Sequence, residues 1–400
     1  MARIITALLS VGTATAFLGA PLPVRPAVST SLRAPSTRAL PVPSRSMRRV
    51  REAARDATVM SASSFKVGVV GATGAVGEEI MGVLKKRGFP VSELHAFASE
   101  RSAGKTLSTP FGDVESELFS LEAVRAMDVV FLAVDGDFAG EWAEKIADGE
   151  DGPYVIDNSS FFRYNPKYPL VIPEINGHLV KKSKLIANPN CTTAVGLMAL
   201  YPLFKKFGLK KMIMSTYQAA SGAGAPGMNE LKDGVAAYAA GKDLTGTNKV
   251  FAYPLPFNLI PQIDKFQENG YTKEEMKVTW ETRKILDLPD LPVSCTAVRI
   301  PTLRAHAEAI TIETELPCPP EEAMAILAKA EGVTLRDDVT QTPAILPMPL
   351  TATGEYNIEV GRIRRSEVFG DTGLDFFVCG DQLLRGAALN AVLVAEKALL

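Results

Sequence analysis

The fold is decided by the stretch FKVGVVGATGAVG at residues 65–77. Its first six residues are a β-branched run, and Glu78–Arg87 follows the last glycine with a helical composition that ends at Gly88. Strand, glycine turn and helix is the context in which a dinucleotide pyrophosphate binds. The cofactor contacts expected in this turn are Gly71, Thr73, Gly74, Ala75 and Val76. A tight glycine turn without a ligand is the alternative.

Alternating apolar runs and helical stretches continue beyond this turn. Such an alternation predicts a Rossmann-like, doubly wound parallel sheet, and we assign residues 63–190 to a nucleotide-binding domain. The strands expected there lie at 94–98, 128–134, 154–156 and 185–187, with a helix at 138–147.

The pattern changes after Cys191. An expected helix at 192–207 is followed by segments whose alternation is typical of a mixed, largely antiparallel sheet. We therefore predict a second, α+β domain over 191–372, and a C-terminal helix within 373–400 that returns to the first domain. The expected strands lie at 211–218, 293–300, 309–316, 358–366 and 374–379, and a further helix at 228–240.

Bulk composition excludes several classes of protein. The chain is 46% hydrophobic and 22% charged, which is typical of a soluble globular protein. A net charge of -2 argues against a nucleic-acid partner, because no broad positive field would neutralise phosphates. The four cysteines show no paired short spacing, so neither a disulfide framework nor a metal site is expected.

Residues 1–62 differ in composition from the rest of the chain. An apolar stretch at 4–20 is too short and too interrupted to span a bilayer, and a segment rich in Ser, Pro, Ala and Arg follows it. This layout predicts a cleavable targeting segment, signal-like and then transit-like, that resembles targeting to a plastid bounded by extra membranes. The mature protein would lie in the stroma, free of membrane. A mitochondrial presequence or a plain disordered tail is the alternative.

The choice of cofactor is expected to lie at the end of the second strand. An acidic side chain there favours NAD, whereas Ser99, Arg101 and Ser102 would bind the 2′-phosphate of NADP. We predict NADP, although Glu100 puts a strict preference in doubt. A solvated surface turn is the alternative.

Cys191 lies in the run NPNCTT at residues 188–193, at an expected loop-to-helix turn. A free thiol has a pKa of about 8.5, so a nucleophilic cysteine needs a site that favours thiolate. The start of the following helix would help, through its dipole and unpaired N–H groups. A buried inert cysteine is the alternative. His306, one of three histidines, has the imidazole chemistry for general acid–base work, with a structural histidine as the alternative.

Five strings in order resemble the aspartate-semialdehyde dehydrogenase family, from about Phe65 to the C-terminus. They are GATGAVG at 71–77, RSAGK at 101–105, NPNCTT at 188–193, YQAASGAG at 217–224, and Arg299 seven residues before His306. The resemblance implies reversible, NADPH-dependent reduction of 4-phospho-L-aspartate to aspartate 4-semialdehyde and phosphate, on the route to lysine, threonine and methionine. It also implies Cys191 as nucleophile, His306 as acid–base and Gln218 as the residue that orients the substrate.

The resemblance implies a set of binding residues as well. Arg299 would grip the α-carboxylate and Glu274 the amine, whereas a solvated helix face is the alternative for Glu274 and Lys277. A homodimer or homotetramer is expected, with residues 226–262 forming part of the contact. The remaining implied contacts are Arg163, Asn190 and Lys277 for phosphate, and Ser221, Gly222 and Gln382 beside the nicotinamide.

Three rival functions are weighed against this one. An N-acetyl-glutamyl-phosphate reductase would share the cysteine, histidine and NADP, but its acetylated amine needs no carboxylate such as Glu274. A catalytically silent NADP-binding protein would not need Cys191 or Arg299. A cysteine hydrolase would not need the glycine turn.

Overall fold

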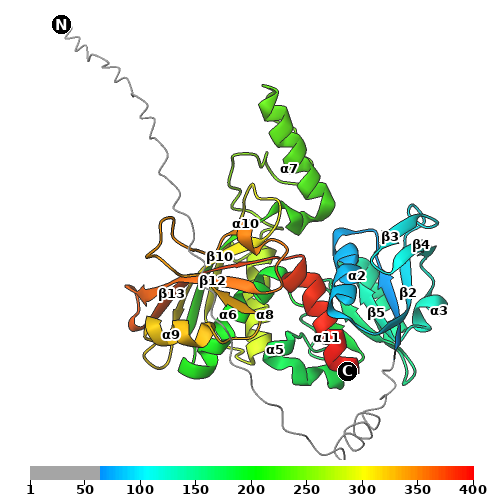
Figure 1. Cartoon of the computed structure of the whole chain (residues 1–400), viewed down its shortest axis with the longest axis horizontal. Coiled ribbons are helices and arrows are strands. Elements are labelled where there is room, and N and C mark those ends of the chain that lie inside the picture. Colours follow the sequence, from blue (N-terminus) through cyan, green and yellow to red (C-terminus); the bar gives the residue numbers. More distant parts are fainter. Residues whose placement is uncertain (1–63) are drawn as a thin grey trace, which may run out of the picture. The chain divides into compact units, whose positions relative to one another are not determined.

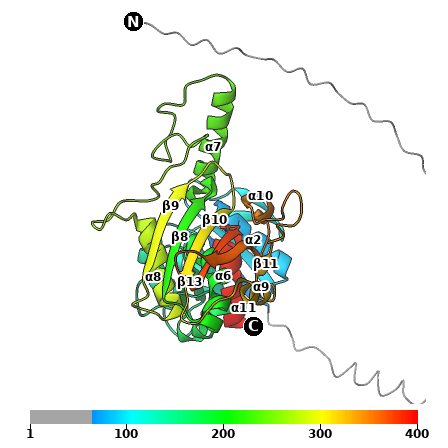
Figure 2. The same cartoon turned by 90° about the vertical axis from the view of Figure 1, so that its left-hand side faces the viewer.

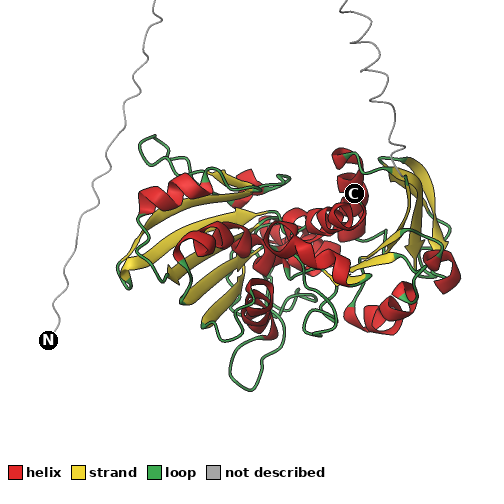
Figure 3. Cartoon of the chain, turned by 90° about the horizontal axis from the view of Figure 1, so that it is seen from below, coloured by secondary structure: helices red, strands yellow, loops and turns green. Residues whose placement is uncertain are grey.

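The computed structural model describes residues 64–400, so the expected targeting segment lies outside the described residues. The described residues form two β-sheets that lie on opposite sides of the structure, with helices between them (Figures 1 and 3). No helix within residues 64–400 is both long and apolar enough to cross a bilayer.

The first sheet has seven strands in the order β3-β4-β2-β1-β5-β6-β7. All neighbours pair in parallel except β3 and β4, which form an antiparallel hairpin at one edge. The order reverses direction between β1 and β5, which is where a doubly wound sheet binds its ligand. The strands are β1 (Phe65–Val70), β2 (Val91–Ala98), β3 (Thr106–Thr109), β4 (Gly112–Leu118), β5 (Val129–Leu132), β6 (Tyr154–Asp157) and β7 (Leu185–Ala187).

Helices cover both faces of this sheet because its central strands are apolar on both sides. On β5, Val129 and Phe131 belong to the core with α2 and α11, whereas Val130 and Leu132 belong to the core with α4. Strand residues alternate between faces, so four consecutive buried residues produce two covered faces. The helices of this half are α2 (Ala75–Arg87), α3 (Leu121–Arg125), α4 (Gly136–Ala147) and α5 (Pro173–Asn176), with α11 (Leu389–Leu399) from the C-terminus.

The second sheet has six strands in the order β11-β12-β13-β10-β8-β9. Its two outer pairs are parallel and the three inner pairs antiparallel, so it is the mixed sheet that was expected. One face packs on α6 (Cys191–Phe207), α8 (Lys273–Leu286) and α9 (Pro320–Leu327). The strands are β8 (Lys211–Gln218), β9 (Val293–Arg299), β10 (His306–Glu313), β11 (Val333–Leu335), β12 (Ile358–Ser366) and β13 (Gly370–Gly380).

One segment projects from the body of the protein. Helix α7 (Gly224–Ala239) extends outward beside the proline-rich loop at 252–262 (Figures 1 and 2). Its tip carries exposed apolar side chains, including Tyr238 at 57% and Phe257 at 70% exposure.

Several element boundaries differ from those expected. Strand β10 begins at His306 instead of residue 309. The C-terminal helix expected at 381–398 is a π-helical turn at Leu384–Ala388 followed by α11. No helix bounds were predicted for α8, where a solvated helix face was the alternative to the binding role of Glu274 and Lys277. A capping box of Thr272 and Glu275 starts this helix, and its acidic side chains are buried.

Candidate active site

A cavity of about 570 Å³ opens where the start of α2, the segments after β5 and β6, the start of α6 and the ends of β8 and β9 meet. It is lined by residues from both halves of the described chain. Eleven residues singled out from the sequence line it: Val76, Arg163, Asn190, Cys191, Gln218, Ser221, Gly222, Glu274, Lys277, Arg299 and Gln382.

The glycine turn between β1 and α2 has the shape that a pyrophosphate requires. Gly71 has φ 83°, and a Cβ there would lie 2.3 Å from the Ala133 carbonyl oxygen. A Cβ on Gly77 would lie 2.4 Å from the Gly71 oxygen, whereas one on Gly74 would meet only that oxygen, at 3.4 Å. Gly71 and Gly77 are therefore required by packing. Gly74, at the exposed helix start beside Thr73 and Ala75, leaves space for an anion.

The turn that is expected to select the cofactor begins at Ser99, directly after β2. The end of β2 pairs with the end of β1. The backbone N–H groups of Ser102 and Ala103 donate to the Ser99 carbonyl at 2.8 and 2.9 Å, which fixes the turn. Glu100 and Arg101 are both exposed, and neither forms an ion pair with any residue in 64–400. The Arg101 guanidinium is therefore available to an anion.

Cys191 is the first residue of α6. Asn190 caps this helix, because its side-chain oxygen accepts the N–H groups of Thr192 and Thr193 at 3.0 and 3.2 Å. The Asn190 amide also donates to Glu274, at 2.9 Å. The cap thus fixes the thiol at the positive end of the helix and at the wall of the cavity.

His306 lies beside the thiol, with Nε2 3.5 Å from the Cys191 Sγ. Its Nδ1 accepts the backbone N–H of Ala219 at 3.0 Å. A backbone amide can only donate, so a neutral ring carries its proton on Nε2, the nitrogen that faces the sulfur. In this state the ring donates a hydrogen bond to sulfur or to a substrate oxygen. Taking up a proton at Nδ1 would break its bond to Ala219.

The site as described holds both groups neutral, which differs from the expected thiolate. Burial raises the pKa of Cys191 to about 12, and the negative charge of Glu274 adds to this effect against the opposing charge of Arg163. Burial and the positive charge of Arg299 lower the pKa of His306 to about 3. Both pKa shifts favour the neutral forms of the thiol and the imidazole near pH 7.

We expect this charge state to appear in alkylation of Cys191 by iodoacetamide in the ligand-free protein. The folded pKa exceeds the ordinary value of 9.0, so the rate should climb about tenfold per pH unit from pH 7 to 9 without levelling. The raised pKa also makes the free energy of unfolding depend on pH. Below the pKa of the thiol in the unfolded chain, the neutral thiol stabilises the folded protein, and this stabilisation is lost as the pH rises towards the pKa in the folded protein. A rate that levels off near pH 7 would contradict this pKa. The rate of alkylation is measured by peptide mapping after timed quenching.

Glu274 and Lys277 are at the site and not on a solvated face. Glu274 is 6% exposed, and its carboxylate accepts from Gln218 at 3.1 Å and from Lys277 at 3.0 Å. Three donors, Lys277, Asn190 and Gln218, hold the pKa of this carboxyl at about 2 despite its burial. Lys277 also contacts Asp264 at 2.9 Å. The site thus carries a fixed negative charge beside an ammonium group.

Arg299 and Gln218 end two adjacent strands, β9 and β8, which pair in parallel. The Arg299 Nη1 donates to the Ala219 carbonyl at 2.6 Å, and its guanidinium lies 5.5 Å from the centre of the Phe251 ring. A Cβ on Gly222 would lie 2.7 Å from the Arg299 Nη1, so the glycine makes room for this arginine.

Gln382 connects the cofactor side of the cavity to the histidine. Its amide donates to the Ser221 hydroxyl, and its oxygen accepts the N–H of Ala305 at 2.9 Å. Ala305 has φ 66°, a left-handed conformation that is unfavourable for alanine. The Gln382 contact therefore stabilises a strained residue directly before His306.

Several residues at or behind the cavity were missed from the sequence, and three of them bear on the geometry of the site. Asp264 lies in an irregular loop, and nothing local marks it. Gly386 lies in the π-helical turn, where a Cβ would come within 2.5 Å of the Cys191 Cβ. Glu281 lies behind Arg163, and its spacing of seven residues from Glu274 would have placed it on the same face of a helix, had α8 been predicted.

Comparisons with known proteins agree with this geometry. The family "Semialdehyde dehydrogenase, NAD binding domain" matches residues 66–183, and "Semialdehyde dehydrogenase, dimerisation domain" matches residues 200–385. An aspartate-semialdehyde dehydrogenase from Aquifex aeolicus is 44% identical over 336 residues, which cover 83% of this chain and 97% of that protein. The chain belongs to the aspartate-semialdehyde dehydrogenase family.

Solved structures of this family have the same fold. Aspartate semialdehyde dehydrogenase II from Vibrio cholerae, complexed with ASA, is 38% identical with a TM-score of 0.79, over 84% of this chain and 98% of that one. The enzyme from Candida albicans with NADP is 25% identical with a TM-score of 0.63, over 84% and 100%. The chain therefore has a pyridine-nucleotide-binding domain and the catalytic domain of the family.

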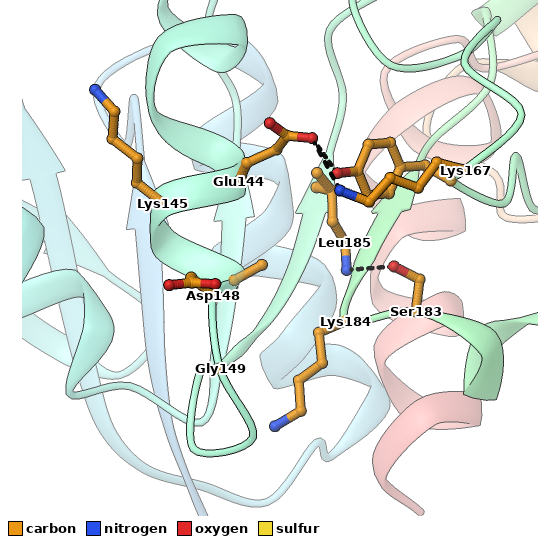
Figure 4. Close-up of a pocket in the computed structure, with 10 residues that line it drawn as sticks. Glu144, Lys145, Asp148, Gly149, Lys167, Ser183, Lys184 and Leu185 are labelled. Atoms are coloured by element: carbon orange, nitrogen blue, oxygen red, sulfur yellow. Dashed lines mark hydrogen bonds and ion pairs between the residues drawn. The ribbon is translucent and has the colours of Figure 1, made fainter.

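A second hollow, of about 480 Å³, lies at the opposite ends of β6 and β7 (Figure 4). Two of its lysines have polar partners: Lys167 lies 3.3 Å from Glu144, and Lys184 donates to the carbonyls of Glu150 and Gly152 at 2.7 and 2.5 Å. None of the site residues expected from the sequence lies here.

Proposed function

We propose that this chain carries out the reaction of its family, the reversible reduction of 4-phospho-L-aspartate by NADPH to L-aspartate 4-semialdehyde and phosphate. One observation carries the proposal: a thiol 3.5 Å from an imidazole shares a cavity with Arg163, Arg299 and Glu274. A sulfur nucleophile, two cations for phosphate and α-carboxylate, and an anion for the amine are what this substrate needs.

The residues divide the chemistry as follows. The Cys191 sulfur bonds to the acyl carbon, the bond from carbon to the phosphate oxygen breaks, and the thiol proton leaves with the phosphate. Bound NADPH supplies the hydride that reduces the resulting thioester. His306 donates a hydrogen bond from Nε2–H to the oxygen that becomes negative at this carbon. The carbon–sulfur bond then breaks to release the aldehyde, and the sulfur takes up one proton from solvent, which restores the thiol. Arg163 and Lys277 hold the phosphate.

A phosphate-dependent assay tests this function. The protein should form NADPH from aspartate semialdehyde, NADP and phosphate, and should not do so from N-acetyl-glutamate semialdehyde. Glu274 is the reason for the difference, because its carboxylate pairs with a free ammonium group and not with an acetylated amine. A preference for the acetylated aldehyde would contradict the proposal, as would repeated turnover to NADPH in the absence of phosphate.

We propose NADP as the cofactor, supported by the exposed, unpaired guanidinium of Arg101 beside two serines. Arg101→Ala should raise the NADPH KM by about tenfold or more and leave the NADH KM nearly unchanged, because NADH lacks the 2′-phosphate. Lys105→Ala, at the same turn, is the matched control. Equal effects on both cofactors would show that Arg101 does not read the phosphate.

We propose a homodimer, supported by the matched dimerisation domain and by the apolar tip that includes Tyr238 and Phe257. The double variant Tyr238→Ser/Phe257→Ser should shift the mass measured by light scattering towards one chain. An unchanged mass would place the contact elsewhere. The domain limits remain proposals, with residues 63–190 for nucleotide binding, 191–372 for catalysis and dimerisation, and 373–400 as a C-terminal unit. Strand β13 crosses the last limit, because it pairs with β10 and β12 in the second sheet.

We also propose a plastid location and a place in lysine, threonine and methionine synthesis, supported by the composition of residues 1–62 and by the reaction. A fusion of residues 1–62 to a fluorescent protein should enter plastids. Accumulation in mitochondria would favour the alternative.

A further inference from the structure

Glu281 is buried behind the cavity, on α8, and does not line it. Its carboxylate joins two parts of the site. One oxygen lies 3.0 Å from the Arg163 Nη1 and accepts the Tyr164 hydroxyl at 3.3 Å. The other accepts the backbone N–H of Asn190 at 2.6 Å. Asn190 is the cap of the helix that begins with Cys191.

Three donors face this carboxylate, so Glu281 acts only as an acceptor and its ionised form fits the site. Arg163 is 7% exposed, and burying its charge without an anionic partner would be costly. Glu281 and the Asn158 carbonyl, which accepts from the Arg163 Nη2 at 2.9 Å, hold one part of the guanidinium. The Arg163 Nε is buried and has no partner within residues 64–400. The guanidinium is thus fixed with a donor left over.

We propose that Glu281 is a positioning residue that orients Arg163 towards the phosphate and fixes the turn that presents Cys191. This positioning role rests on the proposed function, in which Arg163 binds phosphate. Glu281 acts through these residues and does not touch the substrate.

Replacement Glu281→Gln tests this role. Glutamine keeps the shape but places an NH₂ group against a donor and removes the charge opposite Arg163. We expect the phosphate KM to rise on the order of tenfold or more, with a smaller change in the semialdehyde KM and no change in NADPH affinity, because a displacement near 1 Å suffices for such losses.

Glu275→Gln is the matched control, on the same helix and 7% exposed. Its carboxylate accepts the N–H groups of Thr272 and Ala297, at 2.6 and 2.9 Å, and contacts no cavity residue. This variant should lower the melting temperature and leave the phosphate KM unchanged. Should Glu281→Gln fail to fold, Glu281→Asp keeps the charge but is too short to reach both partners, and the same rise in phosphate KM is expected.

The outcomes separate the two proposals. A wild-type protein without phosphate-dependent NADPH formation would overturn the proposed function. An active wild type whose Glu281 variants keep the normal phosphate KM would overturn the positioning role alone. An equal rise in both the Glu281 and Glu275 variants would also overturn it, because the effect would then be general to α8.

Discussion

Replacement of Cys191 by alanine is expected to lower kcat by at least about 10³-fold and to leave the affinity for NADPH unchanged. The thiol forms the covalent bond that lets phosphate leave before the carbon is reduced, and no neighbouring side chain can replace it. Cys191 is the first residue of α6, and its backbone forms part of the helix start that Asn190 caps. Its side chain is thus not needed for the fold.

Two measurements decide this result: turnover in the phosphate-dependent assay and NADPH binding by fluorescence titration. Cys295→Ala is the control, because this thiol is buried away from the cavity, in the core between β9 and α8. It should keep nearly full turnover while losing some stability to the cavity created. Retained turnover in Cys191→Ala would refute its role as nucleophile.

Arg299→Lys should reduce kcat/KM for aspartate semialdehyde by about 10- to 10³-fold, mainly through KM. Lysine keeps the positive charge but offers one ammonium in place of the planar fork that matches a carboxylate. In addition, the backbone contact to Ala219 and the packing over Phe251 position the guanidinium, and lysine reproduces neither.

The phosphate KM and NADPH affinity should change little in Arg299→Lys, which distinguishes loss of the α-carboxylate contact from general damage to the site. Arg283→Lys is a suitable control, since Arg283 lies on α8 outside the cavity and donates to the Leu291 carbonyl. Unchanged steady-state kinetics in Arg299→Lys would show that the carboxylate binds elsewhere.

The nucleotide-binding half could be read from sequence because its signals are local. The run at 65–77 combines β-branched residues with glycines at fixed spacing, and the structure shows why Gly71 and Gly77 tolerate no side chain. The start of β10, in contrast, could not be predicted from the local sequence. It depends on the left-handed φ of Ala305, which a contact from Gln382, 77 residues away in sequence, stabilises.

In the candidate site, too, local sequence signals could be interpreted, whereas contacts between distant parts of the chain could not. Cys191 stands out beside its capping Asn190, whereas Glu274 and Lys277 were placed at the site only by resemblance, with a solvated helix face as the alternative. Only the three-dimensional structure shows that Glu274 pairs with Lys277 and that Glu281 neutralises Arg163. The protonation states were likewise out of reach, because they depend on how much water the folded site excludes.

The central claim, a covalent acyl bond to Cys191, can be tested by omitting phosphate. Protein mixed with NADP and aspartate semialdehyde should then form one NADPH per site and stop, since nothing releases the thioester. Mass spectrometry of the acid-quenched protein should locate one hydroxylamine-sensitive aspartyl group on the peptide that contains Cys191, and none in Cys191→Ala. One equivalent of NADPH without any label on that peptide would contradict the account.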